Sequence, residues 1–195
     1  MESSGISLPL TMDKLRDFII RDCTVSEIKT GMICSNVSKT VSPLQNPRNT
    51  CFLSLTIVRI RGCECLKELT FLMFAPNIKV LTVGFVNQLE DIINKEKACG
   101  GEASGIIPFP RLINLTLDIL PKLKNIYWRP LPLPCLKQID VHKCPNLKKL
   151  PFDSHSGAHG EKGLVIRYRE KEWIEGVEWE DQATETHFLS SCKKI

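Results

Sequence analysis

The chain has 195 residues, of which 43% are hydrophobic and 25% charged, and its formal net charge is +4. This length suits one domain with a sizeable core, and so slight a charge gives no support to binding of nucleic acid or a membrane surface. No apolar run approaches the ~20 residues that span a bilayer, and the first residues lack the pattern of a secretory signal. We therefore expect a cytoplasmic, or otherwise intracellular, protein whose nine cysteines are mostly buried free thiols.

From residue 15 onward, apolar residues recur with the spacing L-x-x-L-x-L-x-x-C/L-x-x-L-x-x-L, which is typical of a leucine-rich repeat. Four units match this spacing at all six positions, and the first unit matches it less well. The predicted units span residues 15–28, 55–69, 78–92, 112–126 and 136–150, with insertions within 35–50 and 95–104. The second insertion contains the run KACGGEASG, which predicts a flexible surface loop.

The L-x-L centre of each unit has a period of two, which places its apolar residues on one face of a short strand. One unit cannot bury that face alone, so neighbouring units must stack. The predicted fold class is therefore an α/β repeat, a leucine-rich-repeat solenoid of about five irregular units with parallel strands on its concave face. We expect residues 1–9 to be an N-terminal extension too short to act as a cap, residues 10–151 to hold the repeats, and residues 152–195 to form an atypical C-terminal cap and tail.

The residues that alternate with the buried ones on each strand should face outward and form a candidate binding surface for a protein partner. The first two units present Arg21, Arg59 and Arg61, whereas the last two present Asp118 and Asp140. This polarity predicts a partner with an acidic patch, since arginine suits bidentate recognition of carboxylates. The alternative is that these are ordinary solvated side chains. The full candidate set is Asp17, Arg21, Arg59, Arg61, Thr82, Asn114, Thr116, Asp118, Gln138, Asp140 and His142.

A metal site is the main competing interpretation of residues 135–159, where Cys135, Cys144, His155 and His159 follow one another. The spacing between the two cysteines is longer than the usual C-x2–4-C of zinc sites. Moreover, Cys144 occupies a repeat position that Val86 fills in a sister unit, which favours a small buried side chain. We expect no metal.

Catalytic motifs give no better alternative to binding. The sequence contains no G-x-x-x-x-G-K-[ST], G-x-G-x-x-G, H-E-x-x-H or G-x-S-x-G motif. A set of Cys144, His142 and Asp140 is disfavoured as a nucleophilic site, because Cys144 should point inward and the other two outward. We expect neither an enzyme nor a bound cofactor.

The acidic tail REKEWIEGVEWEDQATETHFL (169–189) carries Trp173 and Trp179 among its charged residues. The last unit of a stack needs a cap with a polar outer face, so the two tryptophans are expected to form the apolar side of that cap. The competing interpretation is that they anchor a partner protein.

Three segments, CPNLKKLP (144–151), PRLINLTLDILPKLKNIY (110–127) and KEWIEGVEWEDQATETHFL (171–189), resemble the C-terminal repeats of plant nucleotide-binding, leucine-rich-repeat disease-resistance proteins of the coiled-coil class. The resemblance implies a recognition module of innate immunity that senses a pathogen effector or a guarded host protein. It also implies that the module restrains a nucleotide switch. The sequence departs from the family in that no residue here matches the phosphate-binding loop of that switch. Binding of ATP or ADP would thus require a nucleotide-binding module outside this chain.

Two other functions fit the sequence. The first is a stand-alone leucine-rich-repeat scaffold or decoy, and the second is a zinc-binding regulatory protein. We also expect an uncovered apolar layer on the N-terminal side of the first unit, which would make the chain alone marginally stable or prone to associate.

Overall fold

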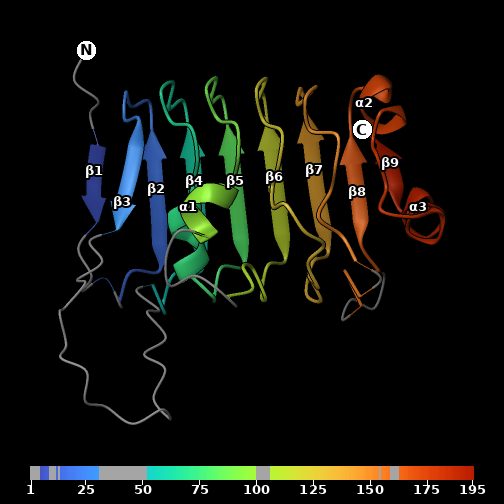
Figure 1. Ribbon diagram of the computed structural model, residues 1–195, viewed down its shortest axis with the longest axis horizontal. Coiled ribbons are helices and arrows are strands. Elements are labelled where there is room, and N and C mark those ends of the chain that lie inside the picture. Colours follow the sequence, from blue (N-terminus) through green and yellow to red (C-terminus); the bar gives the residue numbers. More distant parts are fainter. Residues whose placement is uncertain are drawn as a thin grey trace, which may run out of the picture.

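The computed structural model describes residues 5–8, 12, 14–30, 52–99, 106–153, 155–158 and 163–195. Within these ranges, one parallel sheet of seven strands runs along most of the molecule, and its strands lie side by side in chain order (Figure 1). Each of the five predicted repeat units contributes one strand to it. The strands are β2 (Asp17–Arg21), β4 (Ile57–Arg61), β5 (Val80–Gly84), β6 (Asn114–Asp118), β7 (Gln138–His142), β8 (Val165–Tyr168) and β9 (Cys192–Lys194).

Alternating burial explains why these short segments form strands of one sheet. The second and fourth residues of β4 to β7 point into the core and are at most 2% exposed. Burying one such aliphatic side chain contributes about 1.5–3 kcal/mol, so a slip of register by one residue would expose a whole row. The core residues of these strands are Val58, Ile60, Leu81, Val83, Leu115, Leu117, Ile139 and Val141.

A left-handed residue directly after β2 and after each of the strands β4 to β7 turns the chain back over the core. Gly62 has a φ of 65°, and its counterparts Phe85, Ile119 and Lys143 have φ values of 56°, 54° and 50°. Such a conformation is unfavourable for residues other than glycine. It persists here because each turn bonds to its neighbour: the Phe85 amide donates to the Asp118 carbonyl (2.8 Å) and the Ile119 amide to the His142 carbonyl (2.8 Å).

The N-terminal end differs from its predicted form, because part of the expected extension 1–9 is ordered. Residues Gly5–Leu8 form β1, which pairs in parallel with β3 (Glu27–Thr30) in a separate two-stranded sheet (Figure 1). Leu8 and Ile28 are each only 5% exposed. The alternation of Ile6 and Leu8 is the physical reason for this strand, but four residues are too few for a periodic signal.

The insertion predicted as a loop within 95–104 begins with a helix, α1 (Lys95–Cys99), while residues 100–104 lie outside the described residues. The Asn94 side chain accepts hydrogen bonds from the amides of Glu96 and Lys97, which satisfies donors at the start of the helix. The Lys97 ammonium lies 2.9 Å from Glu68 and 2.7 Å from Glu27, and thereby connects α1 to β3. A short 3-10 helix, η1 (Thr70–Phe74), is buried close to β3. The other predicted insertion, 35–50, lies outside the described residues.

The C-terminal segment 152–195 continues the sheet and then covers its end. Strand β8 pairs in parallel with β7, and β9 pairs in parallel with β8. In the sequence, β8 and β9 are separated by two helices, α2 (Lys171–Glu175) and α3 (Gln182–Leu189). These helices close the end of the molecule opposite to β1 (Figure 1). Phe188 of α3 is 1% exposed and packs against Phe152, with ring centroids 5.1 Å apart. The expected cap is thus a mixture of two further strands and two short helices.

Candidate functional site

The strand register arranges the predicted outward residues in three straight rows across one face of the seven-stranded sheet, which we call the polar face. Neighbouring strands of a sheet lie about 4.8 Å apart, so residues in one row are in reach of one another. The first row is Asp17, Ile57, Val80, Asn114 and Gln138. The second is Ile19, Arg59, Thr82, Thr116, Asp140 and Arg167, and the third is Arg21, Arg61, Gly84, Asp118 and His142.

The third row contains a chain of polar contacts that crosses four strands. The Arg61 guanidinium lies 3.2 Å from Oδ2 of Asp118, and the other oxygen of Asp118 lies 2.8 Å from Nδ1 of His142. Nε2 of His142 lies 3.3 Å from Glu170, which follows β8 and also accepts a hydrogen bond from the Lys143 amide (3.0 Å). Arg61, Asp118, His142 and Glu170 therefore form one connected network.

Gly84 makes this network possible, because it stands in the row between Arg61 and Asp118. With no side chain there, the Arg61 guanidinium extends across β5 to reach β6. A Cβ atom at position 84 would lie 3.3 Å from the Asp118 carbonyl oxygen, 3.4 Å from the Asp118 Cβ and 3.6 Å from Nε of Arg61. Arg61 also lies 4.9 Å above the ring of Phe85, a cation–π contact that fixes its direction further.

In the second row, the ion pair and hydrogen bonds between described side chains lie at its C-terminal end. Nε of Arg167 lies 2.9 Å from Asp140, and the Gln138 amide donates to the same carboxylate at 2.9 Å. Arg167 and Glu170 were missed among the predicted site residues. The segment 163–168 reads as a strand in the sequence, and aligning it with Gln138–Val141 would have placed Arg167 beside Asp140.

The N-terminal end of the polar face carries cations without such partners. Arg21 and Arg59 form no ion pair with any described residue, and Ile19 between them in space is 49% exposed. Of the three arginines predicted to face an acidic partner, Arg61 is instead held by Asp118. The reason is the missing side chain at Gly84, which the polarity argument did not take into account.

The two tryptophans of the tail differ in their surroundings. Trp173 is 4% exposed, its Nε1 donates to the Leu147 carbonyl (2.9 Å), and its ring centroid lies 6.5 Å from that of Tyr168. Trp179 is half-buried and stacks on Phe188, with ring centroids 6.1 Å apart and an interplanar angle of 15°. Trp173 is therefore part of the packed end of the sheet, and Trp179 covers α3.

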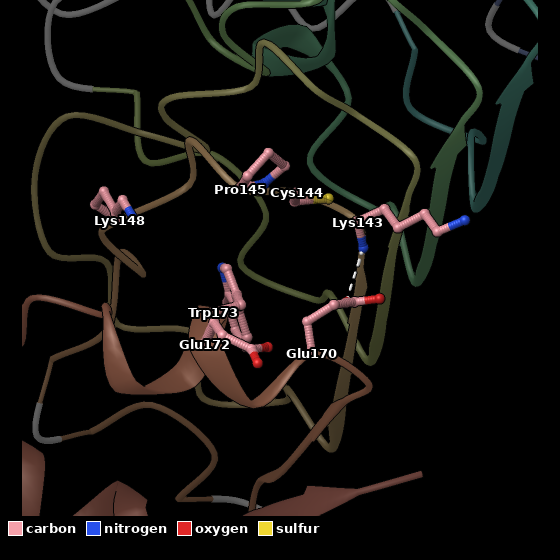
Figure 2. A pocket seen from close by; sticks show the side chains of 7 residues that line it. All are labelled: Lys143, Cys144, Pro145, Lys148, Glu170, Glu172 and Trp173. Atoms are coloured by element: carbon pink, nitrogen blue, oxygen red, sulfur yellow. Dashed lines mark hydrogen bonds between the residues drawn. The ribbon is translucent and has the colours of Figure 1, made fainter.

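A small hollow of about 240 Å³ lies between the turn after β7 and helix α2. Figure 2 shows Trp173 pointing from the helix toward Pro145 and Lys148, with Glu172 beside it and the Lys143 amide bonded to Glu170 at one side. Its lining is mixed in charge and its floor is the buried Trp173 ring. Burial raises the pKa of the Cys144 thiol at the edge of this hollow to about 12, which makes that sulfur a poor nucleophile.

The cysteines occupy the positions that the repeat spacing indicates. Cys63 and Cys144 are 0% and 1% exposed, and Cys23 is half-buried. The Cys144 thiol donates to the His142 carbonyl (3.4 Å) instead of facing a ligand set. In the described part of the chain no three potential metal ligands come together, and His159 of the considered zinc set lies outside that part.

Comparison with known proteins gives consistent matches. The family model described as "Plant disease resistance protein RPS2-like, leucine-rich repeats" matches residues 24–156. In Arabidopsis thaliana, the disease resistance protein RPS5 is 49% identical over 96% of this chain, and the disease resistance protein SUMM2 is 47% identical over 98% of it. The chain spans only 20% and 21% of the length of those two relatives. No solved structure matches the chain.

The disease resistance protein UNI of the same plant is 38% identical over 96% of this chain, and the chain spans only 21% of the length of UNI. These matches confirm the resemblance that the three quoted segments indicated. Among the described helices, none has both the length and the apolar character needed to cross a bilayer.

Proposed function

Since the chain belongs to the family of leucine-rich repeats found in RPS2-like plant disease-resistance proteins, we propose that it is the protein-recognition part of an intracellular defence receptor. Its units stack as a leucine-rich-repeat solenoid, and the polar face is the concave side on which a partner binds. The observation that carries the proposal is that Arg21 and Arg59, beside the exposed Ile19, form no ion pair with any residue that the structure describes.

These residues suit an acidic protein surface with an apolar residue at its centre. Two guanidinium groups on neighbouring strands can each bind a carboxylate in bidentate fashion. Ile19 offers an apolar contact between them that excludes water and strengthens both ion pairs. The partner is a pathogen effector, a guarded host protein or the nucleotide-binding module of a longer receptor.

The relatives are about five times longer than this chain, so the remaining steps of signalling belong to regions outside it. In this proposal the repeats hold the receptor inactive until the partner binds, and ATP or ADP binds to a separate nucleotide-binding module. A stand-alone scaffold or decoy would use the same polar face, but it would need no such module.

The test starts with the chain expressed in plant cells with a photo-crosslinking amino acid at position 59. The control is the same chain with that amino acid at position 193 instead. Proteins crosslinked at 59 alone are identified, and their affinity for the purified chain is measured. The double variant Arg21→Glu/Arg59→Glu should weaken binding about tenfold or more. The affinity of this variant for the partner should also no longer fall as the salt concentration rises.

The matched control is Lys122→Glu/Lys124→Glu, which changes the charge by the same amount in a turn that follows β6. This control should leave the affinity unchanged. Equal weakening by both double variants would mean that net charge alone attracts the partner, and the proposed site would be wrong. In leaves, the Arg21→Glu/Arg59→Glu variant of the longer receptor should also lose pathogen-triggered cell death.

A further inference from the structure

Two cysteines of neighbouring repeat units touch each other at one edge of the molecule. The Sγ atoms of Cys23 and Cys63 lie 2.9 Å apart, with the Cys23 thiol directed at Cys63. Each cysteine follows the last residue of its strand by two positions, and those last residues, Arg21 and Arg61, are register partners. The strand pairing of β2 and β4 thus brings the two thiols together.

We propose that Cys23 and Cys63 are a redox-sensitive pair that forms a reversible disulfide in the presence of a peroxide. Adjacent strands are separated by about 4.8 Å, which lies within the range of Cα–Cα distances that a disulfide requires. Closing the bond needs the sulfur atoms to approach further by about 0.9 Å, a change that side-chain rotation can provide. The inference does not depend on the proposed function.

The chemistry balances with hydrogen peroxide as the oxidant. The Cys23 sulfur, as thiolate, attacks one peroxide oxygen, the O–O bond breaks, and water leaves after proton uptake, which gives a sulfenic acid. The Cys63 sulfur then attacks the Cys23 sulfur, loses its proton, and displaces the sulfenic oxygen as a second water. Two thiols are oxidised by two electrons to one disulfide, and a thiol such as glutathione reverses the step by exchange.

The surroundings assign different roles to the two cysteines. Cys23 is half-buried and lines an open hollow of about 440 Å³, together with Asp22, Gly62 and Phe85, through which a peroxide can approach. Cys63 is 0% exposed, and burial, followed by the contact with Cys23, raises the pKa of its thiol to about 12. Cys23 is therefore the sulfur that meets the oxidant, and Cys63 is the sulfur that resolves the sulfenic acid.

The backbone holds the pair in place from both sides. Asp22 and Gly62, which precede the two cysteines by one residue, both adopt left-handed conformations with φ of 49° and 65°. The Asp22 amide donates to the Arg61 carbonyl (2.9 Å), so the two turns are bonded to each other. A β-carbon at position 62 would lie 3.2 Å from the Asp22 backbone nitrogen and would collide with the Asp22 carboxylate, so that side chain would have to move.

The other units offer an internal comparison, because the same repeat position holds Val86, Leu120 and Cys144. Cys144 is equally buried, and its thiol donates to a backbone carbonyl with no second thiol in contact among the described residues. A peroxide should therefore leave Cys144 reduced under conditions that join Cys23 to Cys63.

The test uses the purified, reduced chain treated with hydrogen peroxide and then digested without reducing agent. We expect the intact mass to fall by two hydrogen atoms and one linked peptide pair to contain Cys23 and Cys63. Dithiothreitol should restore the original mass. The oxidised chain should also melt at a higher temperature, because the bond closes a segment of 40 residues between the two units.

The matched variants are Cys23→Val, Cys63→Val and Cys144→Val, since valine occupies this position naturally at Val86. Cys144→Val should keep the linked peptide and the rise in melting temperature, and the other two should lose both. A chain whose Cys23 and Cys63 stay reduced would overturn the proposal. So would Cys23 converted to sulfinic acid without a link, or a link from Cys23 to the exposed Cys65. Peptide mapping of the unmodified chain decides between these outcomes even if a valine variant does not fold.

Discussion

At one end of the polar face Asp118, His142 and Asp140 are held by neighbouring polar side chains, whereas at the other end Arg21 and Arg59 form no ion pair with a described residue. The paired end also carries α2, α3 and β9, which close the sheet. A side chain held by a neighbour stabilises the fold but has less freedom to bind a partner. The difference therefore separates residues that support the structure from residues that are available for recognition.

The packed C-terminal end should show the largest effect on stability. Trp173→Ala should lower the free energy of unfolding by about 3–5 kcal/mol, because it leaves a cavity and removes the bond to the Leu147 carbonyl. Urea unfolding followed by circular dichroism measures this loss. Trp179→Ala, which truncates a half-buried ring, should cost less, and an equal cost would contradict the distinction between the two tryptophans.

Asp118→Ala tests the network of the third row. The variant leaves Arg61 and His142 without the carboxylate that they share, and should lower the free energy of unfolding by about 1–2 kcal/mol. Asp17→Ala is the control at the opposite end, since Asp17 is exposed and without an ion pair in the described ranges. Asp17→Ala should change the free energy of unfolding by no more than about 0.5 kcal/mol. Similar losses in the two variants would remove the basis of the comparison.

Gly84→Ala should produce a smaller but measurable loss of about 1 kcal/mol. The new Cβ would lie 3.3 Å from the Asp118 carbonyl oxygen, which cannot move easily because it accepts a hydrogen bond from the Phe85 amide. The control is Thr82→Ala, at the neighbouring outward position of β5, which should have almost no effect. A stabilised Gly84→Ala variant would show that the entropy of the unfolded chain outweighs this contact.

The smallest expected effect concerns acid stability at the N-terminal end. A hydrogen bond from the Lys97 ammonium lowers the pKa of Glu27 below its usual value. The resulting stabilisation is present above the unfolded pKa of about 4.5 and is lost as the pH falls through the lower folded pKa. Because Glu27 is about a third exposed, the contribution should be below about 1 kcal/mol. Glu27→Gln and Lys97→Gln should each remove this pH-dependent stabilisation. Thermal melts at pH values from roughly 3 to 7, which include the range where carboxyl groups titrate, measure the loss.

The strands of the five units and their buried residues could be predicted from the sequence, because a short apolar spacing repeats and each unit repeats the same burial pattern. The pairing of the charges could not be predicted in the same way. Arg61 reaches Asp118 only because a residue between them in space, Gly84, has no side chain. Glu170 joins the network from a segment whose place in the sheet is set by long-range contacts.

The parallel register of the sheet has a mechanical consequence. If the two ends of the molecule are pulled apart, the force acts across the strands, so the hydrogen bonds between two neighbours are loaded one after another and not all at once. Strands then detach singly, and the first to leave are those at the less reinforced end. The junction between β2 and β4 has five register pairs, whereas the junction between β8 and β9 has three. A disulfide from Cys23 to Cys63 would lie across the junction between β2 and β4, so oxidation would join these two strands covalently and leave the other junctions to separate first.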